Sequence, residues 1–210
     1  MSYTVKEIFY TLQGEGANAG RAAVFLRFSG CNLWSGLEKD RENAVCKFCD
    51  TDFVGVGLDG GKFDTAEDLS SAVNDKWSKQ DQGKKLVVCT GGEPLLQLDE
   101  KLINTLKTNG FEVAVETNGT IQAPQGIDWL CVSPKAGAEL KQLTAHELKL
   151  VYPQKGAEPE IYETYLTENY LLQPMDGLDS KRNTESAIEY CLSHPKWKLS
   201  VQTHKILGIR

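Results

Sequence analysis

FSGCNLWSGLEKDRENAVCKFCDTD, the stretch from Phe28 to Asp52, holds three of the six cysteines in this 210-residue chain. Fourteen residues separate Cys31 from Cys46 and two separate Cys46 from Cys49, so the pattern is C-x14-C-x2-C. Three thiolates are one ligand short of a closed tetrahedral zinc site, whereas a [4Fe–4S] cluster held by three cysteines keeps one iron open. The spacing indicates a metal centre with an open position, and zinc remains an alternative on the cysteines alone.

The composition indicates one globular domain that spans 1–210. Hydrophobic residues make up 40% of the chain and charged residues 25%, which is enough to bury one core. The net charge of −6 argues against a broad nucleic-acid surface. No signal peptide and no apolar run of roughly 18–20 residues is present, so we expect a cytoplasmic protein without a membrane partner. Three disulfides are another use of six cysteines, which a reducing cytoplasm disfavours.

Strands and helices alternate along the chain. The apolar run Ala22–Phe28 is predicted to be a strand that leads into Cys31. The other predicted strands are 86–90, 112–116, 128–132, 147–152, 170–172 and 198–203, and the predicted helices are 65–79, 98–109, 158–167 and 180–193. Two connections, 117–127 and 136–146, are too short or too weakly patterned for a crossover helix. We therefore expect an α/β fold, a partial (incomplete) TIM-like barrel of mostly parallel strands with fewer helices than strands.

Polar and glycine-rich clusters follow nearly every predicted strand. Ligands bind at the carboxyl ends of the strands in α/β folds of this kind, so these clusters are the predicted site. GGEP, which ends at Pro94, follows one strand, and the loop Leu12–Gly16 (LQGEG) precedes another. Taken singly, each is also compatible with an ordinary tight turn. Arg27, the one charge inside its strand, is either an edge residue or a side chain that grips a carboxylate.

Together, C-x14-C-x2-C after one strand and GGEP after the next resemble the radical S-adenosylmethionine superfamily. More closely, the chain resembles the 7-carboxy-7-deazaguanine synthase family. The expanded cluster-binding loop at 31–49 replaces the usual C-x3-C-x2-C of the superfamily and is a feature of some members of this family. The similar segments extend through nearly the whole chain and are EIFYTLQGEG, FLRFSGCNLW, CKFCDTDF, CTGGEP, ETNGT, VSPK, LKLVYP, QPMDG and QTHK.

The resemblance implies a single radical S-adenosylmethionine domain, with a [4Fe–4S] cluster on the three cysteines and S-adenosylmethionine on its open iron. An electron from the cluster would break the sulfonium and give a 5′-deoxyadenosyl radical. The residues implied to bind this cofactor are Phe48, Gly92, Glu116, Asn118, Ser133, Pro134, Lys135, Gln173, Pro174, Met175 and Asp176. The resemblance also implies Mg²⁺, with Thr51 and Asp50 as oxygen ligands, although Asp50 is equally suited to cap the adjacent turn.

The implied activity is that of a radical lyase in queuosine and 7-deazapurine biosynthesis. It would contract the ring of 6-carboxy-5,6,7,8-tetrahydropterin, expel ammonia and release 7-carboxy-7-deazaguanine. The residues implied to contact the substrate are Leu12, Gln13, Gly14, Glu15, Arg27, Thr90, His204 and, through its free carboxylate, Arg210. Arg27 would hold the substrate carboxylate and Glu15 would accept from the ring amino group. His204, expected at a strand end, is also compatible with a packing role.

The resemblance further implies a homodimer and an electron donor such as flavodoxin. Two other functions share part of the pattern. An activase that places a glycyl radical on a partner protein would share the cluster and GGEP, but it does not require Gln13, Glu15 and Arg27. A zinc- or cluster-stabilised binding module would close the metal with a fourth protein ligand.

Overall fold

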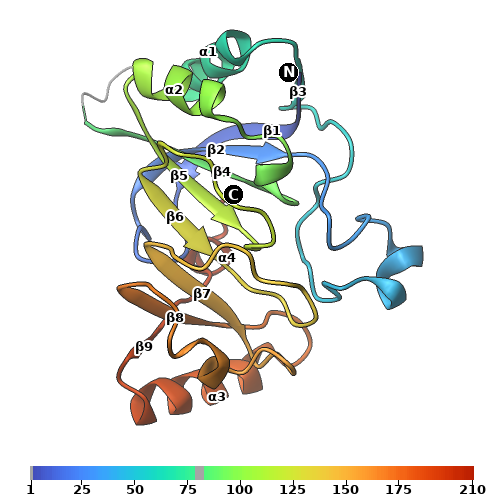
Figure 1. The fold of residues 1–210 in the computed structure, drawn as a ribbon, viewed down its shortest axis with the longest axis vertical. Helices are drawn as coiled ribbons and strands as arrows, with labels where there is room; N and C mark the ends of the chain where they lie inside the picture. The colour runs from blue at the N-terminus through green and yellow to red at the C-terminus, as the bar shows by residue number, and fades with distance from the viewer. Residues whose placement is uncertain (1, 79–82) are drawn as a thin grey trace.

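The computed structural model describes residues 2–78 and 83–210 as one curled sheet with helices packed against it (Figure 1). Its nine described strands lie in the order β3-β1-β2-β4-β5-β6-β7-β8-β9. β1 pairs antiparallel with β2 and with β3, and all neighbours from β2 to β9 are parallel. The strands are β1 (Tyr3–Leu12), β2 (Ala22–Phe28), β3 (Gly61–Phe63), β4 (Lys85–Gly91), β5 (Phe111–Thr117), β6 (Trp129–Val132), β7 (Glu147–Tyr152), β8 (Asn169–Pro174) and β9 (Trp197–Leu199).

Few helices cover this sheet. In Figure 1, α1 and α2 lie together near one end of the sheet and α3 lies near the other. The helices are α1 (Ala66–Lys76), α2 (Glu100–Thr108), α3 (Ser180–Ser193) and α4 (Thr203–Leu207), with short 3-10 turns η1 (Glu38–Asn43), η2 (Pro94–Leu96) and η3 (Pro159–Tyr162). The expected α/β architecture, an open sheet of mostly parallel strands with fewer helices than strands, is confirmed. No described helix has the length and apolar character needed to cross a membrane.

The two faces of the sheet have different roles. Side chains alternate between the faces of a strand, and on β4 Val87 packs in the main core whereas Val88 belongs to a small separate cluster. Helices α1 and α2 supply Leu69 and Leu102 to the main core, and both side chains are fully buried. Thr90 lies on the same face of β4 as Val88. This face is therefore apolar near the middle of the strand and polar at its carboxyl end, where Thr90 lines the cavity.

Three of the predicted elements differ from the structure by more than two residues at one end or are not formed. Residues 158–167 are not a helix, because only η3 forms, and Leu166 then bridges in parallel to Thr144. The predicted strand 198–203 ends at Leu199, and Thr203 begins helix α4, so His204 lies on a helix and not at a strand end. The predicted helix 65–79 begins as expected, with Thr65 accepting from the Asp68 amide, but its last turn ends at Lys76; the predicted end, Lys79, lies outside the described residues.

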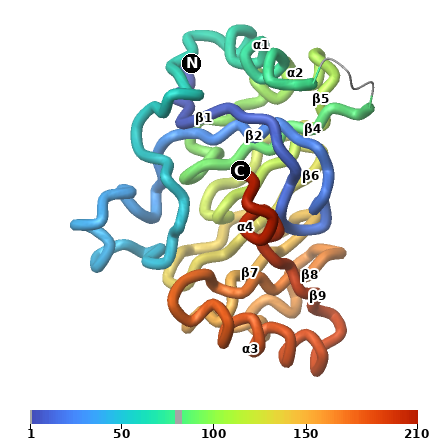
Figure 2. Tube along the Cα trace, turned by 180° about the vertical axis from the view of Figure 1, so that it is seen from behind, coloured from blue at the N-terminus to red at the C-terminus, as the bar shows by residue number. Residues whose placement is uncertain are grey.

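The loop after β1 meets the segment that follows β9. Thr203 donates to the Gly14 carbonyl through its backbone amide (3.0 Å) and its hydroxyl (2.8 Å). The Gly16 amide donates to Ser200 Oγ (3.0 Å). Figure 2 shows the result from behind, with α4 lying between the N-terminal strands and β7 to β9. These contacts join the loop after the first strand of the open sheet to the segment after its last strand.

Candidate active site

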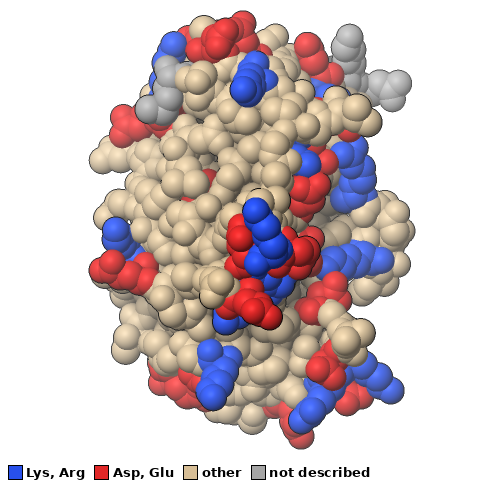
Figure 3. Space-filling view, turned by 90° about the vertical axis from the view of Figure 1, so that its right-hand side faces the viewer, with Lys and Arg blue, Asp and Glu red and all other residues tan. Residues whose placement is uncertain are grey.

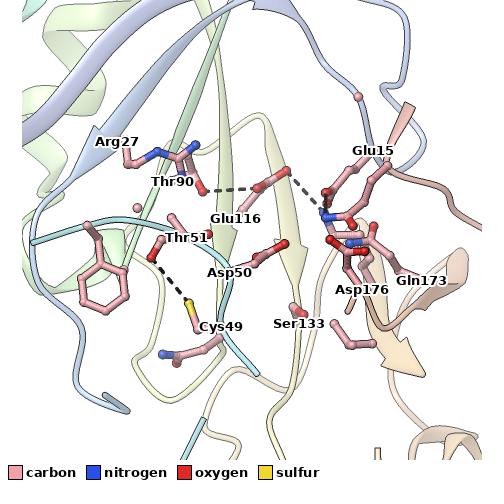
Figure 4. Close-up of a pocket in the computed structure, with 18 of the residues that line it drawn as sticks. Glu15, Arg27, Cys49, Asp50, Thr51, Thr90, Glu116, Ser133, Gln173 and Asp176 are labelled. Atoms are coloured by element: carbon pink, nitrogen blue, oxygen red, sulfur yellow. Dashed lines mark hydrogen bonds and ion pairs between the residues drawn. The ribbon is translucent and has the colours of Figure 1, made fainter. Parts of the chain in front are cut away.

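A cavity of about 440 Å³ opens at the carboxyl ends of the parallel strands (Figure 4). This volume is in the usual range for a small-molecule site. Every residue predicted for the site lines it except Pro134, which is buried and whose carbonyl accepts from Gln154 Nε2 (3.4 Å). The predicted residues that the cavity brings together are Leu12, Gln13, Gly14, Glu15, Arg27, Cys31, Cys46, Phe48, Cys49, Asp50, Thr51, Thr90, Gly92, Glu116, Asn118, Ser133, Lys135, Gln173, Pro174, Met175, Asp176, His204 and Arg210.

Three thiols form one part of the cavity wall. Cys31 follows β2, and its sulfur accepts from the Leu33 amide (3.4 Å). The interaction between the Cys46 and Cys49 side chains raises the pKa of Cys46 and lowers that of Cys49 to about 6. All six cysteines are free, and no group of three or more His, Cys, Asp or Glu among the described residues is spaced for a single metal ion. Three soft sulfur donors in one wall match the ligand set of an iron–sulfur cluster.

The fourteen residues between the first two thiols form a tethered insertion. The Arg41 guanidinium lies 4.0 Å from the centre of the Trp34 ring and donates to the carbonyls of Lys47 (2.9 Å) and Cys49 (3.2 Å). Trp34 in turn packs edge-on against Phe53, with 5.6 Å between ring centres. Arg41 therefore connects the insertion to the backbone that carries the last two thiols.

The GGEP turn follows β4 and contacts the ends of the strands on both sides of it, β2 and β5. A side chain on Gly92 would overlap the Gly30 carbonyl and come within 2.8 Å of Cys31 Cβ, so the turn lies directly against the first thiol. Glu93 is fully buried, and its carboxylate accepts from the Thr117 hydroxyl (2.7 Å) and the Asn118 amide (2.8 Å). Burial raises the pKa of Glu93 despite these hydrogen bonds.

A buried lysine, Lys149, lies between two carboxylates in another part of the cavity wall. Figure 4 labels the two carboxylates, Glu15 and Glu116. Lys149 Nζ lies 2.5 Å from Glu15 Oε2 and 3.5 Å from Glu116 Oε1. Burial alone would raise the pKa of Glu15, but the Lys149 charge and hydrogen bonds from Lys149, Gln202 and Gln173 lower it to about 2. Glu15 is therefore a carboxylate at neutral pH, although it is buried.

Arg27 and Arg210 share one carboxylate on β1. Arg27 Nε donates to Glu7 Oε1 (2.8 Å), and Arg210 binds Glu7 Oε2 (2.6 Å) and Asp59 (3.0 Å). The Arg210 guanidinium also lies 4.5 Å from the centre of the Phe9 ring. The Arg210 side chain is thus docked on β1, and Arg27 has one N–H in an ion pair while its side chain lines the cavity.

Lys205 on α4 connects the two sides of the cavity mouth. Its Nζ lies 2.5 Å from Asp50, next to the last thiol, and 2.6 Å from Asp176 after β8. Its neighbour His204 packs against Gly14. Figure 3 shows acidic and basic side chains mixed at the centre of the face on the right of Figure 1, where neither sign predominates.

Comparison with known proteins places the chain among enzymes of one kind. A scan against protein-family models gives no match. The chain is 62% identical over 210 residues to the 7-carboxy-7-deazaguanine synthase of Caulobacter vibrioides, and the match covers 100% of both chains. The chain belongs to the 7-carboxy-7-deazaguanine synthase family. The enzyme of the same name from Bradyrhizobium diazoefficiens is 61% identical over 211 positions, again over 100% of both chains.

A solved structure supports the same family at the level of the fold. The crystal structure of QueE from Escherichia coli matches with a TM-score of 0.68 and 26% identity, and the match covers 96% of this chain and 94% of that one. The family resemblance expected from the segments around the cysteines, GGEP and QTHK is therefore confirmed. The roles of the individual site residues remain predictions. Their positions around one cavity are compatible with these roles.

For this member of the 7-carboxy-7-deazaguanine synthase family, sequence reasoning missed several polar residues that line or support the cavity. Lys149, Gln202 and Lys205 line it, and Glu93 is buried behind it. Lys149 carried a readable signal, because it is a charge inside the apolar run LKLVY of a predicted parallel strand. Glu93 and Lys205 stood inside the quoted motifs GGEP and QTHK, but nothing local to them indicated their partners.

Proposed function

We propose that the chain converts 6-carboxy-5,6,7,8-tetrahydropterin into 7-carboxy-7-deazaguanine and ammonia, as a step of 7-deazapurine and queuosine biosynthesis. Family membership over the full chain supports this reaction. The observation that carries the proposal is one cavity that joins three thiols, the Gly92 turn and the polar set Gln13, Glu15 and Arg27. A binding module or a radical activase requires the thiols, but it has no use for that polar set.

The thiol wall fits a [4Fe–4S] cluster with one open iron, because it offers three sulfur donors beside a wide cavity. When bound, the cluster and S-adenosylmethionine would together supply the radical that removes a hydrogen atom from the substrate. The chain's own part is to orient and enclose. Gly92 would present backbone to the methionine amino group, Asn118, Ser133 and Lys135 would bind its polar groups, and residues 173–176 would enclose the adenosine.

A magnesium ion is a further part of the proposal. Thr51 and Asp50 both line the cavity beside Cys49, and oxygen donors of this kind suit Mg²⁺. Asp50 already has Lys205 at 2.5 Å as an ion-pair partner. We therefore assign Thr51 as the main protein ligand, with the substrate and water supplying the remaining oxygens.

The ends of the substrate would meet groups of opposite charge. Arg27 keeps N–H groups beyond the one that it gives to Glu7, and a guanidinium binds a carboxylate through two parallel hydrogen bonds. Glu15 and the backbone of Leu12–Gly14 would bind the polar edge of the ring at the other end. The family assignment also supports a cytoplasmic homodimer that receives its electron from a donor such as flavodoxin, without nucleic-acid or membrane partners.

The test is an anaerobic assay of reconstituted protein with S-adenosylmethionine, Mg²⁺ and the pterin. We expect 7-carboxy-7-deazaguanine and one ammonia for each pterin consumed. Intact cluster without turnover of the pterin would reject the proposal, and hydrogen abstraction from a polypeptide would favour the activase instead. Zinc in place of iron and sulfide would favour the binding module.

A further inference from the structure

Lys149 is buried where a lone charge would be costly. It lies in the middle of β7 and only 5% of the residue is exposed. Its neighbours Leu148 and Leu150 point to the other face of the sheet and are fully buried in the main core. Lys149 therefore projects into the cavity, and a buried ammonium persists only when it is paired with negative charge.

The partners of Lys149 are two carboxylates that each keep free acceptor capacity. Glu15 receives Lys149 on one oxygen and Gln202 Nε2 on the other (3.0 Å), and Gln173 also interacts with it. Glu116 receives Gln13 Nε2 (3.0 Å) and Lys149 on one oxygen, with the Thr90 hydroxyl (3.2 Å) on the other. A carboxylate has about four lone-pair sites, so neither group is saturated by these protein donors. The cluster combines two carboxylates with one ammonium and presents unused acceptors to the cavity.

We propose that Lys149 is a positioning residue, which holds Glu15 and Glu116 as one bridged pair of acceptors for the N–H edge of a flat, amino-substituted ring. This inference rests on the proposed function and deepens it, because it names the device that selects an amino-substituted pterin. An analogue with an oxo group in place of the ring amino group would set its own acceptor against this pair. A site built to pair with a donor rejects an analogue that lacks the donor far more strongly than an apolar pocket does.

The charges around Lys149 decide how the pair responds to pH. The groups that face it are Glu15 on the first loop, Glu116 on β5, Cys131 on β6, Glu147 on β7 and the lysine Lys135. Burial lowers the pKa of Lys149, but the two bridged carboxylates more than offset this and raise it. Without Lys149, burial would remain the largest influence on Glu15 and would raise its pKa. Glu15 would then lose its charge as the pH falls.

The experiment measures binding and turnover of the pterin by anaerobic, cluster-loaded protein with S-adenosylmethionine. Lys149→Met is compared with the wild type at about pH 6 and about pH 8.5, and we expect its dissociation constant to be about 10- to 100-fold higher at the lower pH and less affected at the higher. The ratio to the wild type cancels any titration of the pterin itself. Lys149→Arg keeps the charge and should restore most of the pH profile. Lys101→Met, an exposed lysine on α2, is the matched control and should bind as the wild type does.

A double variant covers the case in which Lys149→Met does not fold. In Glu15→Gln/Lys149→Met, position 15 has no carboxylate that could be left without its lysine partner. We therefore expect this double variant to bind the pterin no worse than Glu15→Gln alone. A double variant that binds the pterin much more weakly than Glu15→Gln would overturn the inference. A loss of affinity in Lys149→Met that is equal at both pH values and is not reduced in Lys149→Arg would also overturn it. If the wild type neither binds nor converts the pterin, the proposed function itself fails. If the wild type does both and Lys149→Met keeps its affinity and pH profile, only this inference fails.

Discussion

Glu93 connects two turns of the site through one buried carboxylate. It accepts from the Leu95 amide (3.0 Å), the Thr117 hydroxyl and the Asn118 amide. Replacement by alanine would leave these donors buried and unpaired, so we expect Glu93→Ala to lower the free energy of unfolding by about 3 kcal/mol. Urea denaturation checks this, with the exposed Glu139→Ala as the control. A loss as small as that of the control would show that Glu93 does not join the turns.

Glu15 should make the free energy of unfolding depend on pH in the acid range. Its pKa is about 2 in the folded protein, below the ordinary value of 4.5, so the stability that it contributes is present above about pH 4.5 and is lost as the pH falls towards 2. Glu15→Gln removes this contribution. The difference in unfolding free energy between the wild type and Glu15→Gln should therefore shrink between about pH 5 and about pH 3.

The measurement is urea denaturation of both proteins at the two pH values, with Glu168→Gln at an exposed position as the control. Comparison with a variant is needed because other carboxyl groups, such as Glu112 and Asp176, also have lowered pKa values. A difference that stays constant from pH 5 to pH 3 would mean that Lys149 does not hold Glu15 ionised.

The insertion 32–45 separates the first thiol of the site, Cys31, from the other two. Arg41 is its main tether, through its contacts with Trp34 and with the Lys47 and Cys49 carbonyls. We expect Arg41→Ala to release η1, so that backbone amides at 44–51 exchange hydrogen at least about tenfold faster while amides in β4 are unchanged. Hydrogen-exchange mass spectrometry provides the measurement. The exposed Lys39→Ala serves as the control, and equal exchange in the two variants would contradict the role of Arg41.

The elements differ in how well the sequence predicts them. β2 and β7 have the predicted bounds, because each is a mostly apolar run broken by only one or two charges, as is usual for buried parallel strands. β1 was not predicted, since Lys6 and Glu7, which line the cavity, interrupt its apolar residues and its pairing register shifts between Val5 and Glu7. Residues 158–167 look helical in composition, but Tyr165 is buried and donates to the Gln142 carbonyl, so tertiary packing overrides the local preference.

The complete fold depends on a junction between its first and last segments. The hydroxyls of Ser200 and Thr203 bind the backbone of Gly16 and Gly14. We expect Ser200→Ala/Thr203→Val to lower the unfolding free energy by about 2 kcal/mol and to speed hydrogen exchange at 14–17. Exchange in β4 serves as the internal control. Protection of 14–17 that equals the wild type would show that the junction is held by other contacts.

Sequence reasoning found the site residues that directly follow strands, because the fold class alone brings the carboxyl ends of parallel strands together. It did not find pairs such as Lys149 with Glu15 or Lys205 with Asp50, which are 134 and 155 positions apart in the chain. Such pairs depend on how the open sheet curls and where α4 docks. No local pattern of apolar and polar residues encodes that arrangement.

The central claim is that Cys31, Cys46 and Cys49 hold an iron–sulfur cluster whose open iron takes S-adenosylmethionine. The most direct measurement is the electron spin resonance spectrum of anaerobically reconstituted, reduced protein with and without S-adenosylmethionine. We predict about four irons and four sulfides per chain and a cluster signal that shifts when S-adenosylmethionine is added. A signal that S-adenosylmethionine leaves unchanged, or one bound zinc with no iron or sulfide, would contradict the claim.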